Sequence, residues 1–97
     1  MNAEIIKFIK KCGISELEIE DMLNIAPMLE VQSFEDFMAN CTLLVKYGYP
    51  KIDLDVLLLS NPNIFAISKK DLEAELKELK SKYGDIEEVL KENPFII

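Results

Sequence analysis

Apolar residues recur along this chain in three short stripes, each of which ends near a proline. Counted from Pro27, Pro62 and Pro94, an apolar residue stands eight, five and four positions before each proline and two positions after it. In chain order these residues are Ile19, Met22, Leu23, Leu29, Leu54, Leu57, Leu58, Ile64, Ile86, Val89, Leu90 and Ile96. Because positions i, i+3 and i+4 share one helix face, each stripe predicts a helix with one buried side just ahead of its proline.

A glycine precedes each stripe and indicates the end of an earlier helix. Gly13, Gly48 and Gly84 each follow a stretch that carries an apolar residue five positions earlier. Glycine is favoured just past a helix end, and proline stops a helix because it lacks a backbone N–H. The prolines are 35 and 32 residues apart and the glycines 35 and 36, spacings typical of helical repeat proteins. The sequence thus predicts three units, over about residues 1–32, 33–67 and 68–97.

Capping residues place the helix starts in the same register. Ser15, Ser33, Ser68 and Asp85 each stand three positions before an acidic residue, an arrangement that suits a helix N-terminus. With the glycines and prolines, they predict helices over about residues 3–12, 16–24, 34–47, 54–60, 69–83 and 86–92. No segment has a convincing strand pattern. We therefore predict an all-α chain that forms one domain over residues 1–97, a short helical-repeat array of three two-helix units.

Composition agrees with a small globular helical protein. The chain is 49% hydrophobic, but no apolar run approaches the roughly 18 residues that a membrane helix needs. Its first residues carry lysines after the apolar positions and include Glu4, unlike a secretory signal or a transit peptide. We expect a cytoplasmic protein that does not enter a membrane. Cys12 and Cys41 are expected to be buried, reduced thiols rather than a disulfide.

Patterns for catalysis and metal binding are weak. The chain has no histidine to activate a cysteine, and two cysteines alone do not complete a tetrahedral zinc site. Asp53 and Asp55 lack the glycine and the distant glutamate of a calcium loop, and the three isolated glycines do not make a phosphate-binding loop. We expect no enzymatic activity, no cofactor, no metal ion and no small-molecule substrate.

The stretches LLLSNPNIF and VLKENPFII resemble the repeats of the mitochondrial transcription termination factor (mTERF) family, and the resemblance covers nearly the whole chain. It implies units of two α-helices and a short 3₁₀ helix after the proline, stacked into a curved, left-handed array whose concave side binds nucleic acid. It also implies that Leu23, Leu58 and Leu90 are core residues. The tetratricopeptide repeat, an alternative, has an aromatic and small-residue signature that this chain lacks.

The charges do not favour nucleic-acid binding. The chain has 18 acidic residues against 11 basic ones, all of them lysine, and each predicted unit is net acidic. Phosphate binding relies on clustered basic residues, and arginine supplies bidentate contacts that lysine cannot. The local exception is Lys70, Lys77 and Lys80, which share one face of a predicted helix. We interpret them as a solvated face with i,i+4 ion pairs; the alternative is a reduced nucleic-acid-binding surface of the termination-factor type.

The two ends of the predicted array offer apolar surface, because stacked repeats leave their ends uncovered. The chain stops at Phe95, Ile96 and Ile97, and this tail either folds back after Pro94, which we favour, or joins another chain. At the other end, Ile6 lies on a flank of the first predicted helix that we expect to be exposed. Our hypothesis is a small non-catalytic binding or adaptor module that holds a protein partner, or a second copy of itself.

Overall fold

The computed structural model describes residues 1–50 and 53–97, and this part of the chain contains six α-helices and no strand. In chain order the elements are α1 (Ala3–Lys11), α2 (Glu16–Ile25), η1 (Pro27–Glu30), α3 (Phe34–Lys46), α4 (Leu54–Ser60), η3 (Pro62–Phe65), α5 (Lys69–Tyr83) and α6 (Ile86–Glu92). Every predicted helix is present, with its ends within one residue of the predicted ones. The prediction of an all-α chain is confirmed.

Side-chain caps explain why the helices begin where they do. At the start of α2, the Ser15 N–H donates to Glu18 Oε1 at 2.9 Å and the Glu18 N–H donates to Ser15 Oγ at 3.2 Å, a reciprocal capping box. The other predicted caps also accept a backbone N–H from three residues further on; they are Ser33, Ser68 and Asp85. Asn2, which the sequence pattern did not single out, caps the first turn of α1.

The predicted helix stops behave as their chemistry requires at all three glycines and all three prolines, since α2, α4 and α6 each end two residues before a proline. Gly13, Gly48 and Gly84 have φ angles of 90°, 104° and 84°, a region that side chains with a Cβ rarely adopt. The 3₁₀ helices η1 and η3 begin at Pro27 and Pro62. Pro94 is followed by a single turn, which the Ile96 N–H closes by donating to the Asn93 carbonyl at 3.2 Å. The third post-proline 3₁₀ helix that the mTERF resemblance implies is therefore replaced by a turn.

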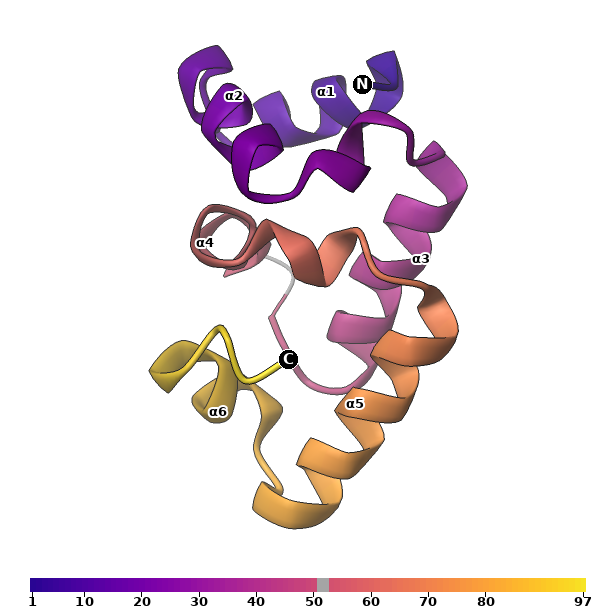
Figure 1. Ribbon diagram of the computed structural model, residues 1–97. Helices are drawn as coiled ribbons and strands as arrows, with labels where there is room; N and C mark the ends of the chain where they lie inside the picture. Colours follow the sequence, from indigo (N-terminus) through magenta and orange to yellow (C-terminus); the bar gives the residue numbers. More distant parts are fainter. Residues whose placement is uncertain (51–52) are drawn as a thin grey trace.

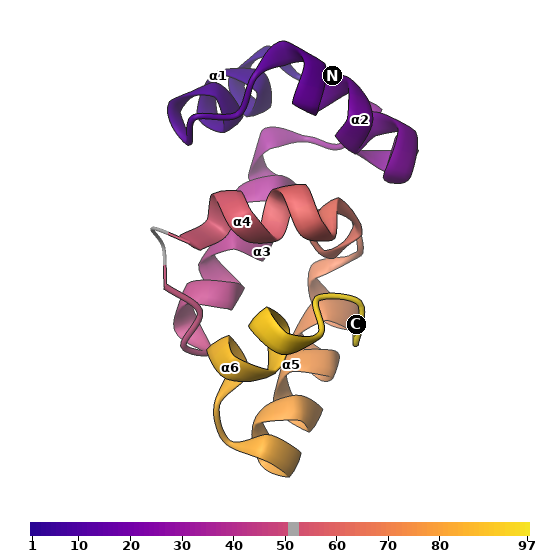
Figure 2. The same ribbon diagram turned by 90° about the vertical axis from the view of Figure 1, so that its left-hand side faces the viewer.

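Successive helices alternate between two layers. Helices α1, α3 and α5 form one layer, in which α3 contacts both α1 and α5. Helices α2, α4 and α6 form the other, on the left of Figure 1, where α2 contacts α4. Figure 2, which turns this side toward the viewer, places α4 and α6 in front of α3 and α5. We call these the first-helix layer and the second-helix layer.

A cluster of buried side chains runs through both layers, from Ile5 in α1 to Leu90 in α6. Nine of the twelve apolar residues at the four proline offsets are buried, including Leu58 with 0% of its surface exposed. Leu23, Val89 and Ile96 are partly buried and pack against this core. The expected burial is thus confirmed for Leu58 and Leu90, whereas Leu23 is only partly buried.

Two buried asparagines hold the backbone of the turns that follow the second helices. Asn40 Nδ2 on α3 donates to the Phe65 carbonyl at 3.1 Å and to the Ile67 carbonyl at 2.8 Å. Asn61 Nδ2 donates to the Pro94 carbonyl at 2.7 Å. Helix ends leave carbonyl oxygens without an intrahelical partner, and burying such groups unpaired is unfavourable. These amides therefore tie the turns after α4 and α6 to the rest of the stack.

Candidate functional site

Charge is divided unequally between the two layers. Helices α2, α4 and α6 carry eight carboxylates and one lysine, whereas α1, α3 and α5 carry seven carboxylates and nine lysines. The one lysine of the second-helix layer, Lys91, lies 2.6 Å from Glu87 and 3.3 Å from Asp53, and these carboxylates raise its pKa. The second-helix layer therefore presents a strongly acidic surface, and the first-helix layer a nearly balanced one.

Large apolar side chains are exposed on the same acidic layer. Leu17 and Ile25 on α2 are 74% and 50% exposed, and Val56 and Leu59 on α4 are 52% and 41% exposed. On α2, Leu17, Asp21 and Ile25 follow each other at intervals of four residues, so they share one face of the helix. Single exposed apolar residues are common on protein surfaces, but Ile25 and Leu59 line the same hollow between two contacting helices and so form an apolar patch.

A groove between α2 and α4 brings the acidic and apolar groups together. The side chains that line it are Glu18, Asp21, Met22, Ile25 and Leu59. We call it the α2–α4 groove, and its volume is about 490 Å³. Hydrogen bonds from the Ser15 backbone and hydroxyl hold the pKa of Glu18 below its usual range, so this carboxylate is charged at neutral pH. The groove thus has an apolar floor and a negatively charged edge.

A repeated acidic position contributes to this surface, and the sequence interpretation missed it. Seven residues before the three prolines stand Glu20, Asp55 and Glu87, one on each helix of the second-helix layer. Comparing charges by thirds of the chain hides this pattern, because each third contains one helix from each layer. Counting charges separately for the first and second helix of each unit would have revealed it from the sequence.

The lysines proposed for nucleic acid lie on the other layer. Lys70, Lys77 and Lys80 are all exposed on α5, and Lys77 Nζ lies 3.9 Å from the Glu73 carboxylate. Four carboxylates occupy the same helix, so the three lysines do not form an uninterrupted basic surface. The structure keeps them together on one helix but places acidic groups among them.

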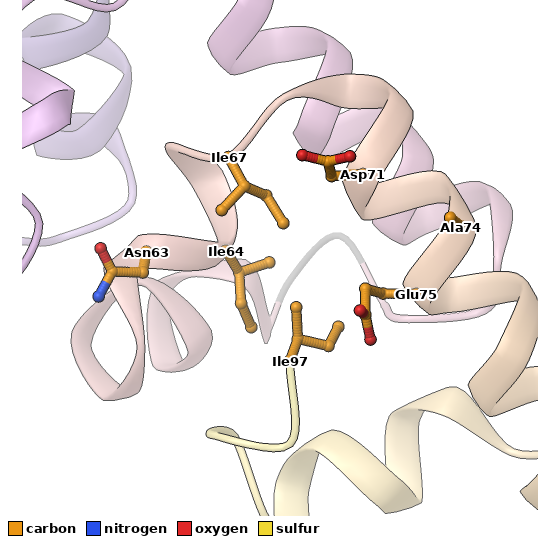
Figure 3. A pocket seen from close by; sticks show the side chains of 7 residues that line it. All are labelled: Asn63, Ile64, Ile67, Asp71, Ala74, Glu75 and Ile97. Carbon is orange, nitrogen blue, oxygen red and sulfur yellow. The ribbon is translucent and has the colours of Figure 1, made fainter.

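The residues proposed for partner binding at the two ends are covered to different degrees. Ile6 is partly buried against the core, as are Ile96 and Ile97 of the tail. The tail folds back after Pro94, and Figure 3 shows Ile97 beside Ile64 in a pocket between η3 and α5. Phe95 is different, because 66% of its surface is exposed. Most of the apolar surface proposed at the ends is therefore occupied by contacts within the chain.

The two cysteine thiols are buried to different degrees. Cys41 is 3% exposed, and burial raises the pKa of its thiol to about 12. Cys12 is also a free thiol but is only partly buried, which corrects the expectation that both are buried: it is the C-cap of α1, at the edge of the helix. Burial, followed by the nearby charge of Asp55, raises the Cys12 pKa. Both thiols are therefore protonated and weakly nucleophilic at neutral pH.

The part of the chain that the structure describes holds neither a metal-binding cluster nor a membrane-spanning helix. No group of three or more histidine, cysteine, aspartate or glutamate residues at positions 1–50 and 53–97 is arranged to hold a metal ion. Over the same residues, none of the helices has the length and apolar character needed to cross a bilayer.

Comparisons with known proteins add no relative. No family model matches the chain, and searches of curated proteins and of solved structures also find no match.

Proposed function

We propose that this chain is a small non-catalytic protein-binding module that holds its partner on the second-helix layer. The observation that carries this proposal is the coincidence of exposed apolar side chains and carboxylates on α2 and α4. Aqueous solvent does not favour exposure of such an apolar patch, and binding of a protein partner would remove it from water. The surrounding charges would select the partner and orient it.

The charge of this layer disfavours other macromolecules. Nucleic acids and anionic membranes are both polyanions, and eight carboxylates against one lysine would repel them. Pairing of two copies through this face about a two-fold axis would also bring like charges together. A different protein with a basic surface is therefore the partner that fits best.

We also propose that the chain consists of three mTERF-like repeats, as the sequence resemblance implies. Support comes from the two 3₁₀ helices that begin at Pro27 and Pro62 and from the buried residues at matching offsets in the three units. In this proposal the units supply a scaffold rather than the nucleic-acid role of that family, because the basic residues are interleaved with acids.

The alternative function is nucleic-acid binding through Lys70, Lys77 and Lys80. It is supported by the exposure of all three side chains on one helix. Their proximity to acidic groups on α5, such as Glu73 beside Lys77, weakens the attraction for phosphate. We therefore place this function second.

Site-specific photo-crosslinking in the native host tests the main proposal. A photoreactive amino acid in place of Val56 on α4 samples the second-helix layer, and one in place of Glu78 on α5 is the matched control on the first-helix layer. We expect a discrete protein adduct from position 56 alone, and mass spectrometry would identify the protein and the crosslinked segment. The purified partner should then bind this chain in calorimetry. Identical adducts from both positions, or none from position 56, would contradict the proposal.

A further inference from the structure

We infer that the α2–α4 groove binds a basic amphipathic helix of the partner. This inference rests on the proposed function and names the chemistry of the occupant. The groove combines exposed apolar side chains, Ile25 and Leu59, with the carboxylates of Glu18 and Asp21. A segment that fits both must present apolar residues on one side and lysine or arginine on the flanks.

Charge complementarity identifies the polar part of the occupant. Within the bounds of α2 and α4 there are five carboxylates and no lysine. The Lys10 side chain of α1 lies 2.7 Å from Glu16 and partly neutralises the first turn of α2, but Glu20 and Asp21 lie beyond that turn. Basic residues on the bound segment would pair with these carboxylates, and the ionised state of Glu18 adds to the attraction.

The spacing of the apolar side chains matches a helix. Leu17 and Ile25 are eight residues apart on α2, which corresponds to about 12 Å along the helix axis. A helix that lies along α2 covers this length with apolar residues at positions i, i+4 and i+7 or i+8, the usual anchors of a helix in a groove. The groove volume of about 490 Å³ accommodates several inserted side chains but not a whole helix, so the bound helix lies on top of it.

The α2–α4 groove suits an extended peptide less well than a helix. Extended segments gain much of their affinity from main-chain hydrogen bonds, usually to the edge of a sheet, and the described residues contain no strand. Side-chain amides can also bond a main chain, but none of the residues that line the groove carries one. A helix satisfies its own main chain and needs only side-chain contacts.

The test uses a synthetic peptide as the probe. It is a fluorescently labelled helix of about 18 residues, or about five turns, with leucine at i, i+4 and i+7 spacing and lysine elsewhere. A peptide of the same composition with its leucines scattered around the helix is the matched control. Affinity is measured by fluorescence anisotropy with the whole chain and with two double variants. One carries Ile25→Ser and Leu59→Ser; the other, a control on the first-helix layer, carries Val45→Ser and Thr42→Ser.

We expect the amphipathic peptide to bind at least about tenfold more tightly than the scattered one. The Ile25→Ser and Leu59→Ser variant should lose this preference, whereas the first-helix-layer variant should keep it, and circular dichroism should show both variants folded. Equal binding of the two peptides, or an unchanged preference in the groove variant, would overturn the inference. If either occurs while position 56 still yields a specific adduct, the protein-binding function stands and only the class of occupant is wrong.

Discussion

Asn61 and Pro94 are joined by a hydrogen bond of 2.7 Å, in which the side-chain amide donates to the proline carbonyl. Asn61 is 2% exposed and lies between α4 and η3, while Pro94 follows α6. One polar side chain thus connects the turn after α4 to the turn after α6. This contact helps to hold the C-terminal tail against the preceding helices.

Replacement of Asn61 by alanine should therefore loosen the tail. Removing the donor leaves a partly buried carbonyl without its partner, which lowers the free energy of unfolding by about 1 to 3 kcal/mol. Urea denaturation measures this loss, and hydrogen exchange at the Ile96 amide reports the tail directly. Asn24→Ala, at an exposed position on α2, is the control and should change neither quantity. Unchanged protection of Ile96 in Asn61→Ala would show that the tail is held by its apolar contacts alone.

Two adjacent leucines on α4 test the register of the core. Leu58 is 0% exposed and Leu59 is 41% exposed. Leu58→Ala should lower the free energy of unfolding by about 2 to 5 kcal/mol, because it leaves a cavity in the packed core. Leu59→Ala should change it by less than about 0.5 kcal/mol. Chemical denaturation of the two variants side by side would reject this register if the losses were equal or reversed.

The pH dependence of stability should reflect the buried thiol of Cys41. Its pKa rises from an ordinary value of 9.0 to about 12 in the folded chain. Between these two pH values the unfolded chain binds fewer protons than the folded one, so the stability contributed by this group is complete below pH 9.0 and is lost as pH rises. The free energy of unfolding therefore falls by at most about 1.4 kcal/mol per pH unit as this thiol ionises.

Urea denaturation between about pH 8 and pH 10 would measure this slope, since the ordinary thiol pKa lies within that window. Cys41→Ala should be less stable overall but should show a smaller decline with pH. Burial, together with the charge of Asp53, raises the pKa of Tyr49, so part of the decline persists in the variant. Parallel pH profiles for the two proteins would mean that Cys41 does not titrate differently on unfolding.

Nucleic acid should not bind measurably, even at low salt, where electrostatic attraction is strongest. In a titration with labelled RNA and DNA at about 50 mM salt, we expect no change in anisotropy, because carboxylates lie among the α5 lysines. Binding that disappears on Lys77→Glu and Lys80→Glu substitution would instead support the alternative function. The acidic groups on the second-helix layer provide the matched control: Glu20→Gln and Asp21→Asn should not abolish such binding.

The sequence predicts the helices of this chain well, because the signals for their ends are local. The capping box of Ser15 and Glu18 and the positive φ of Gly84 both follow from residue types at or near the helix ends. The burial of Leu58 follows equally from its place in an apolar stripe. Each of these features depends on neighbours within a few positions along the chain.

Features that depend on how the helices are arranged could not be predicted from the local sequence. The Asn40 side chain donates hydrogen bonds to carbonyls about 25 residues further along the chain. Nothing in the sequence around Asn40 indicates that this side chain is buried. The neighbours that cover Ile97 come from η3 and α5, so its burial depends on how the tail folds back. The α2–α4 groove likewise exists only because α2 and α4 are adjacent in one layer.

The unequal charges of the two layers also give the molecule a permanent electric dipole moment across its thickness. In the field of a positively charged partner, this moment exerts a torque that turns the second-helix layer toward the partner before any contact forms. A larger fraction of collisions then begins in a productive orientation. Added salt would weaken this preorientation and slow association, while dissociation, which depends on the contacts once made, would change much less.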